Sequence, residues 1–200
     1  MTVETLKLIG GALCLDFANS ADYENGRVTQ EYLHTYDDFL VWSQRVGVLS
    51  EEQVQHLRTV AQPERAAQVL EETLGLRDVI YRIFSAAVAG RTASRNDLEA
   101  LNAAFTESVR WLRIVAADEG YAYLCGGSDD DLNRPLWSIV QTAAALLTSP
   151  ELPLVRQCAA DDCSYLFVDT SRNRSRRWCD MDDCGNRAKA KRHYRRTKQA

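Results

Sequence analysis

Four cysteines near the C-terminus place the strongest constraint on the fold of this 200-residue chain. They form two pairs, with four residues inside each pair and 15 residues between the pairs: Cys158, Cys163, Cys179 and Cys184. A short polar segment cannot bury four thiols in a core of its own. Two short-spaced pairs match a tetrahedral thiolate site, for which Zn²⁺ is the favoured ion. We predict one structural zinc ion, because four thiolates leave no coordination position open for catalysis. Iron, a redox pair or separate buried thiols are the alternatives.

The N-terminus and the apolar content predict a cytoplasmic protein. Residues 1–7 include Glu4 and lack the basic and apolar regions of a secretory signal. Apolar runs such as Ala143–Leu147 are far shorter than the roughly 20 residues that cross a bilayer. We therefore expect reduced cysteines. A hydrophobic fraction of 46% suits a globular core, in which we place Cys14 and Cys125 as small apolar residues.

Charge divides the chain into two parts. The formal net charge is −4, but residues 1–155 carry 22 acidic and 12 basic groups, whereas residues 156–200 carry 6 acidic and 12 basic groups. The sign changes near Ser149–Leu154, a segment with two prolines. We predict a domain of residues 1–150 and a small domain of residues 151–200. Four zinc-bound thiolates would lower the positive charge of the second domain without reversing it.

Residue patterns predict a mainly helical α+β fold. Apolar side chains recur at three- and four-residue spacing in five helical stretches, at about 35–47, 50–61, 63–89, 94–105 and 135–147. Alternating residues predict one β-hairpin in Val109–Cys125, and Asp22–Gln30 is expected to be a loop. Leu8–Asn19 suits a short buried helix or a strand. After the domain boundary we expect a treble-clef-like or ribbon-like zinc finger with a strand at Tyr165–Val168 and a basic helix from Gly185 onward.

The last 30 residues are strongly basic. Residues 171–200 hold 11 basic and 3 acidic groups. Arginine-rich surfaces bind nucleic acids through phosphate contacts and counterion release. We predict DNA as the partner, contacted by Arg172, Arg174, Arg176, Arg177, Asn186, Arg187, Lys189, Lys191, Arg192, Arg195 and Arg196. For Asn186 and Arg187, helix capping or support of the second cysteine pair is an equal alternative. A solvated tail, or docking on the acidic N-terminal part, is the alternative for the whole segment.

Other function classes receive less support. His34, His56 and His193 are far apart, and the chain has no glycine-rich phosphate loop, serine elbow or paired-histidine motif. Asp16, Asn19 and His34 could share a pocket, but such residues more often cap helices or satisfy buried backbone groups. We predict no enzymatic activity. A small-molecule effector of the N-terminal domain, a protein-interaction or RNA-binding zinc module, and a homodimer stay open, although no heptad seam indicates dimerisation.

Two motifs resemble known families. The segment Cys179–Arg187, which ends in Cys-Gly-Asn-Arg and follows Arg176-Arg177-Trp178, is similar to the CGNR zinc finger. The segment Gly10–Asn19 resembles the ABATE domain, which accompanies this finger in bacterial stress-induced transcription regulators. The resemblance implies that the two cysteine pairs bind zinc and that the protein regulates transcription by binding DNA. It assigns no role to Gly10–Asn19.

Overall fold

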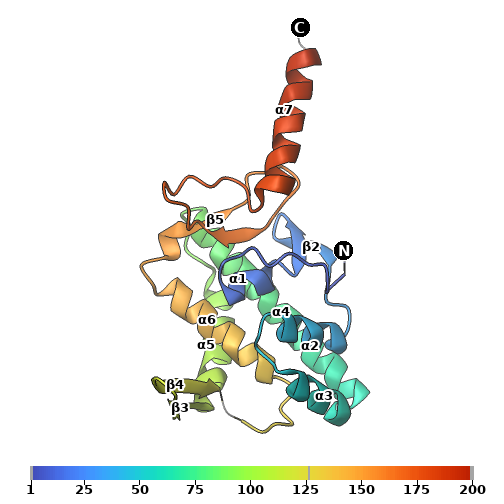
Figure 1. Ribbon diagram of the computed structural model, residues 1–200, viewed down its shortest axis with the longest axis vertical. Helices are drawn as coiled ribbons and strands as arrows, with labels where there is room; N and C mark the ends of the chain where they lie inside the picture. Colours follow the sequence, from blue (N-terminus) through green and yellow to red (C-terminus); the bar gives the residue numbers. More distant parts are fainter. Residues whose placement is uncertain (1, 126, 199–200) are drawn as a thin grey trace.

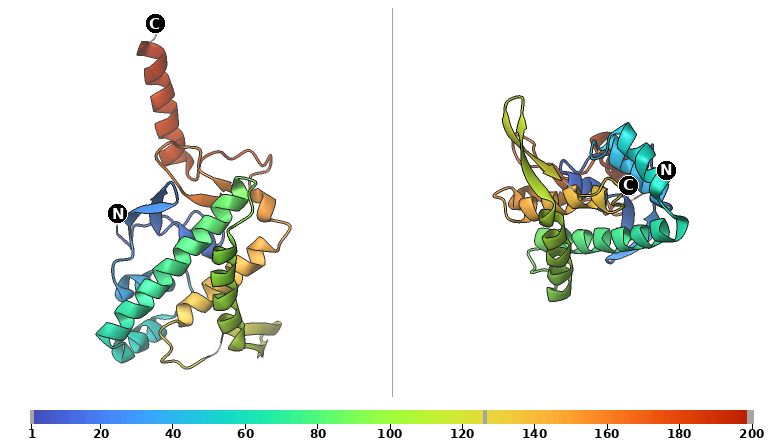
Figure 2. Two further views of the ribbon diagram at one scale, coloured as in Figure 1. Left: turned by 180° about the vertical axis from the view of Figure 1, so that it is seen from behind. Right: turned by 90° about the horizontal axis from the view of Figure 1, so that it is seen from below.

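A computed structural model describes residues 2–125 and 127–198, without the side chains of residues 125, 192, 193 and 195–198. A helical body carries the last helix at one end (Figures 1 and 2). The helices are α1 Leu13–Ala18, α2 Tyr36–Arg45, α3 Glu51–Val60, α4 Pro63–Val88, α5 Arg95–Arg110, α6 Arg134–Leu147 and α7 Asn186–Lys198, with short turns η1 Leu152–Leu154 and η2 Met181–Gly185. The strands are β1 Ala21–Glu24, β2 Arg27–Glu31, β3 Leu112–Ala117, β4 Gly120–Cys125, β5 Val155–Gln157 and β6 Leu166–Val168. The predicted mainly helical α+β class is confirmed.

The helices of residues 2–150, here called the N-terminal body, begin where their capping signals predict. Thr35 and Ser50 close capping boxes at the starts of α2 and α3, where each hydroxyl accepts a hydrogen bond from a backbone N–H. Pro63 begins the 26-residue helix α4. Phe17 of α1 packs on Trp42 of α2 in the core, with ring centroids 5.3 Å apart. None of the helices in the described part of the chain has the length and apolar character of a membrane span.

The strands form more hairpins than the sequence patterns indicate. Across the described residues there are three two-stranded antiparallel sheets, β1–β2, β3–β4 and β5–β6. The hairpin expected in Val109–Cys125 is confirmed as β3–β4, although α5 takes the first residues of that range. The expected loop at Asp22–Gln30 is wrong, because β1 and β2 pair there. Asn25 and Gly26 form the turn with φ of 52° and 75°, the left-handed conformation that an Asn-Gly hairpin turn requires.

A buried ion pair holds the β1–β2 hairpin on α4. The side chain of Arg77 is 1% exposed, and its guanidinium donates hydrogen bonds of 2.6 and 2.8 Å to the two carboxylate oxygens of Glu31. It also donates to the hydroxyl of Tyr23, whose ring stacks on Tyr81 at 3.6 Å between centroids. A bidentate pair of this kind fixes orientation as well as distance. The hairpin is thereby positioned beside the cysteine cluster.

The hydrophobic core continues from the N-terminal body into residues 151–198, here called the zinc module. Strand β6 lies against α1, and Leu166 is fully buried there. The Asn19 amide pairs with the Leu166 backbone in both directions, donating to its carbonyl and accepting from its N–H at 2.8 Å each. The carbonyl of Gly10 accepts a further 2.8 Å hydrogen bond from the N–H of Val168. The Gly10–Asn19 segment therefore acts as a neighbouring strand edge for β6.

The paired glycines of this segment are required by its geometry. A Cβ on Gly10 would lie 2.8 Å from the backbone nitrogen of Asp16, closer than any real contact allows. Gly11 has a φ of 73°, and a Cβ there would lie 3.5 Å from Val168. The Asp16 carboxylate accepts from the Gly10 N–H at 2.8 Å and so holds the turn closed. The motif is a docking site for β6, which the sequence alone did not reveal.

We expect Asn19→Ala to destabilise the protein by about 2–4 kcal/mol, because it leaves two buried backbone groups of Leu166 without partners, at roughly 1–3 kcal/mol each. Chemical denaturation of the zinc-loaded protein measures the free energy of unfolding. The control is Asn102→Ala on the exposed side of α5, which should change stability by less than about 0.5 kcal/mol. Equal effects of the two substitutions would contradict the docking role.

Candidate zinc centre and basic surface

The four predicted cysteines converge at one point. Cys158 and Cys163 lie in the turn between β5 and β6, Cys179 follows a long loop, and Cys184 lies in η2, directly before α7. All four sulfur atoms lie within 4.8 Å of one another. The Sγ atom of Cys179 is 3.6 Å from that of Cys163 and 3.6 Å from that of Cys184. Sulfurs bound at 2.3 Å to a tetrahedral Zn²⁺ would be about 3.8 Å apart, whereas a disulfide would bring two of them to about 2.05 Å.

This arrangement is treble-clef-like, since the first pair lies on a hairpin turn and the second pair lies at the start of a helix. The strand expected at Tyr165–Val168 is present as β6, Leu166–Val168, in the insert between the two pairs. Its partner strand β5 lies before Cys158, so the hairpin closes around the first pair.

The charges of the thiols favour a cation among them. Hydrogen bonds from the thiols of Cys163 and Cys179 hold the pKa of the Cys158 thiol well below its ordinary value. The same contacts raise the pKa of Cys163 and Cys179, because they donate to a neighbouring thiolate, and burial raises the pKa of Cys184. Without a cation, ionisation of one thiol therefore disfavours ionisation of its neighbours. A divalent ion at the centre removes that penalty, and the residues present fit Zn²⁺.

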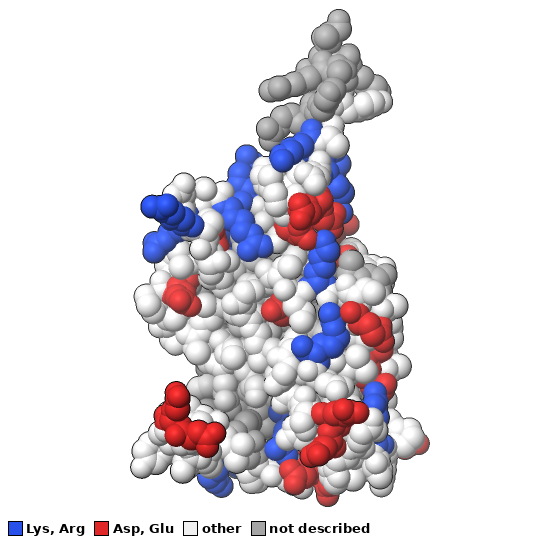
Figure 3. Space-filling view, viewed as in Figure 1, with Lys and Arg blue, Asp and Glu red and all other residues white. Residues whose placement is uncertain are grey.

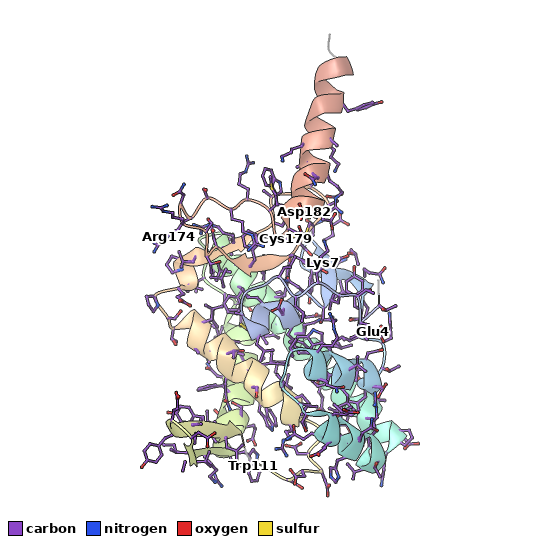
Figure 4. The ribbon with its side chains drawn as sticks, in the orientation of Figure 1. Glu4, Lys7, Trp111, Arg174, Cys179 and Asp182 are labelled. Atoms are coloured by element: carbon purple, nitrogen blue, oxygen red, sulfur yellow. The ribbon has the colours of Figure 1, made fainter. Side chains whose placement is uncertain are left out.

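The residues after Cys184 bind the cluster to α7. Arg187 donates to the Cys184 sulfur at 3.2 Å and to the carboxylate of Asp183 at 2.8 Å. The side-chain amide of Asn186 donates to the carbonyl of Asp182 at 2.9 Å. These contacts match the alternative in which Asn186 and Arg187 support the second cysteine pair. From the body, the Lys7 ammonium forms an ion pair with Asp180, and Figure 4 shows Lys7 below the cluster.

The loop that joins β6 to Cys179, residues 170–178, is held in a fixed shape and is here called the arginine loop. Buried Asp169 accepts three hydrogen bonds at its start, from the N–H and the hydroxyl of Ser171 and from the N–H of Arg176. The Ser171 hydrogen bonds lower the pKa of this carboxyl group, so it stays ionised. The guanidinium of Arg176 lies 4.4 Å from the centre of the Phe167 ring and donates to the carbonyls of Trp178 and Cys179. Arg176 is therefore an internal support of the loop.

The predicted nucleic-acid residues divide into engaged and exposed side chains. Lys191 lies 3.7 Å from the carboxylate of Asp162, and Arg187 and Arg176 are engaged as described above. Within the described residues, Arg172, Arg174 and Lys189 are exposed and form no ion pair, and exposed Arg177 lies over the Trp178 ring. Figure 3 shows Lys and Arg side chains around the end of the molecule that carries α7. The side chains of Arg192, Arg195 and Arg196 lie outside the described residues.

Several other predicted residues have structural partners. Asp16 and Asn19 bind backbone groups of Gly10 and Leu166, and His34 is exposed. Cys14 is fully buried, and burial raises the pKa of its thiol to about 12, as its assignment to the core implies. The side chain of Cys125 lies outside the described residues.

The fold and the site define a zinc-finger protein whose metal module is packed on a helical body. Comparison with family models agrees with this class. The ABATE family, described as "Putative stress-induced transcription regulator", matches residues 11–150, and the CGNR zinc finger matches residues 155–197. The chain belongs to the ABATE family and carries a CGNR zinc finger with one structural zinc site. No curated protein matches the sequence.

We expect the purified protein to contain one zinc ion per chain, measured by mass spectrometry of the metal. Cys158→Ser and Cys184→Ser should each reduce the zinc content, because a hydroxyl replaces a thiolate ligand. Cys14→Ala is the matched control and should keep one zinc per chain. Acidification should release the metal, since protons compete for the thiolates. A protein with the four cysteines free at neutral pH and excess zinc would contradict the site.

We expect Arg187→Ala to weaken zinc binding by about 10–100-fold, the range measured for residues that contact a metal ligand. The guanidinium touches the Cys184 sulfur, and its loss leaves that thiolate less stabilised. Competition with a chromophoric chelator measures the affinity. Lys189→Ala removes one positive charge from the same helix without touching a cysteine and should leave the zinc affinity unchanged.

Proposed function

We propose that the protein is a cytoplasmic DNA-binding transcription regulator that contacts DNA through the arginine loop and α7. The observation that carries this proposal is the ordered display of unpaired cations beside the zinc site. The family description supports the regulatory role. The acidic N-terminal body repels the phosphates of DNA, which favours contact at the basic zinc module. Phosphate would therefore meet the zinc module.

The shape of α7 supports contact with a groove. The helix has 13 residues and a length of about 20 Å, and Figure 1 shows it extending away from the body. The major groove of B-DNA is about 12 Å wide and admits one α-helix. The first turn of α7 is engaged with the cysteine cluster through Arg187, so the later turns are the part that enters the groove. Arg172, Arg174 and Arg177 would then contact phosphates beside it, which positions the helix without reading sequence.

A groove between the two parts of the chain supports the proposal of a small-molecule effector. It has a volume of about 1050 Å³ and joins the β1–β2 hairpin, the end of α4 and the turn that holds Cys163. A molecule bound there would contact both the body and a zinc ligand, and thermal-shift screening of metabolites would detect its binding.

Our proposal also includes the prediction that the protein is not an enzyme. It is supported by the structural roles of Asp16 and Asn19, which bind backbone groups.

We expect the full chain to bind duplex DNA with a strong salt dependence, measured by fluorescence anisotropy between 50 and 200 mM salt. Replacing Arg172, Arg174 and Arg177 together by alanine should reduce the slope of log K against log salt by about 2–3, at about 0.9 for each phosphate contact. The control replaces Arg65, Arg95 and Arg110 of the body, which changes the net charge equally and should keep the slope. No binding at low salt would refute the proposal. Preferential binding of RNA would contradict DNA as the partner and favour the alternative of an RNA-binding zinc module.

The variant Asp169→Asn separates loop order from simple charge attraction. It removes one negative charge from the zinc module, so charge attraction alone would tighten DNA binding. Loss of the carboxylate weakens the bonds to Ser171 and Arg176, so our proposal expects weaker binding at unchanged zinc content. Tighter binding would show that the shape of the arginine loop does not matter.

A further inference from the structure

One of the four zinc ligands is more accessible than the others. Cys158, Cys179 and Cys184 are 7%, 2% and 3% exposed, whereas Cys163 is only partly buried. Of these four cysteines, Cys163 alone also lines the groove of about 1050 Å³ that lies between the body and the zinc module. The groove therefore gives small molecules in solution a path to one particular ligand of the cluster.

The same cysteine also borders a small cavity beside the cluster. This cavity has a volume of about 170 Å³, and Cys163, Cys179 and Cys184 all line it, whereas Cys158 lines neither the cavity nor the groove. The Sγ atoms of Cys163 and Cys179 are 3.6 Å apart, which is van der Waals contact. Cys179 is therefore the neighbour best placed to react with a modified Cys163.

This combination is typical of cysteines that are sensitive to oxidation. The thiolate is the reactive form of cysteine, and a cysteine that binds zinc does so as a thiolate. Susceptibility to oxidation increases with thiolate character and exposure, and sensor cysteines often lie beside a second cysteine that completes a disulfide. Cys163 has the accessibility, and Cys179 is the adjacent cysteine. Among the four ligands, Cys163 is therefore the one that an oxidant meets first.

The charges of the groove favour a small uncharged oxidant. Asp161 and Asp162 directly precede Cys163 in the sequence, and both line the groove together with Asp22 and Glu24. The lining as a whole contains five carboxylates and two arginines. An excess of negative charge repels anionic reagents such as the disulfide of glutathione. Hydrogen peroxide and small alkyl hydroperoxides carry no charge and are not repelled.

We propose that Cys163 is an oxidation site for hydroperoxides, and that its oxidation ends in a Cys163–Cys179 disulfide with release of zinc. In the first step the Cys163 thiolate attacks one oxygen of hydrogen peroxide. The S–O bond forms, the O–O bond breaks, and a hydroxide ion leaves with the electron pair. In the second step the Cys179 thiolate attacks the Cys163 sulfur, the S–S bond forms, the S–O bond breaks, and a second hydroxide ion leaves. The two thiolates lose two electrons in total, and these reduce one peroxide molecule.

Disulfide formation removes two of the four zinc ligands. The remaining pair, Cys158 and Cys184, cannot complete a tetrahedral site. The turn between β5 and β6 and the start of α7 then lose the metal that joins them. Asn19 and Gly10 still hold β6 on the body, because their hydrogen bonds do not involve the cluster. Oxidation therefore loosens α7 and leaves the body folded, and a thiol that reduces the disulfide allows zinc to bind again.

Peptide mapping of the full-length, zinc-loaded protein tests the proposal. The protein is treated with less than equimolar hydrogen peroxide, and a chromophoric chelator measures the released zinc. Trypsin and a protease that cleaves before aspartate together separate all four ligands, since Asp161 lies within the first pair and Asp180 within the second. Dimedone should trap a sulfenic acid at Cys163, and the first disulfide should join Cys163 to Cys179.

Histidine variants compare the accessible ligand with a buried one. Histidine can replace cysteine as a zinc ligand and has no sulfur to oxidise. Cys163→His should slow the peroxide-driven release of zinc by at least about tenfold, because the sulfur that reacts first is absent. Cys158→His is the matched control, since it makes the same change in the ligand set, and should release zinc at the wild-type rate. Metal analysis before treatment shows that each variant holds zinc, and the mapping of the wild-type protein does not depend on either variant.

The proposal is wrong if peroxide leaves the zinc in place, if the first disulfide does not include Cys163, or if the two zinc-loaded histidine variants release zinc at equal rates. None of these measurements uses DNA, so a failure of DNA binding would leave the oxidation site unaffected. One consequence rests on the proposed function: oxidation should abolish DNA binding, and a thiol reductant with added zinc should restore it.

Discussion

The tetrahedron of sulfur atoms determines where three separate segments of the zinc module lie. One ion among Cys158, Cys163, Cys179 and Cys184 fixes the β5–β6 turn, the end of the arginine loop and the start of α7 relative to one another. Each of these segments is too short to fold by itself, so metal binding supplies much of the free energy that orders them. The zinc site therefore also positions the exposed arginines and α7.

The zinc module depends equally on the N-terminal body. Strand β6 contributes Leu166, Phe167 and Val168 to the common core, where Asn19 and Gly10 complete its hydrogen bonds. A fragment of the module alone would expose these side chains to water and leave the strand edge unpaired. DNA-binding experiments should therefore use the full chain and not the isolated zinc module. The acidic body has a structural role in addition to any role in sensing.

Local signals in the sequence were sufficient for much of this structure. Capping residues such as Thr35 and Ser50 located helix starts, and cysteine spacing located the zinc ligands, because both depend on residues that are close in the chain. The β1–β2 hairpin was not predicted. Its strands are mostly polar and suggested a loop, although the Asn25-Gly26 dipeptide is typical of a hairpin turn. The role of Gly10–Asn19 could not be inferred, since its partner strand lies 147 residues further along. The supporting role of Arg176 likewise depends on Phe167, which packing places beside it.

The pairing of Asn19 with Leu166 also has a consequence for synthesis. The two residues are separated by 147 positions, which a ribosome adds in roughly 7–30 s at 5–20 residues per second. During that interval the Gly10–Asn19 segment has emerged, but its partner strand does not yet exist. This edge of the body therefore has no partner until the last quarter of the chain has been synthesised.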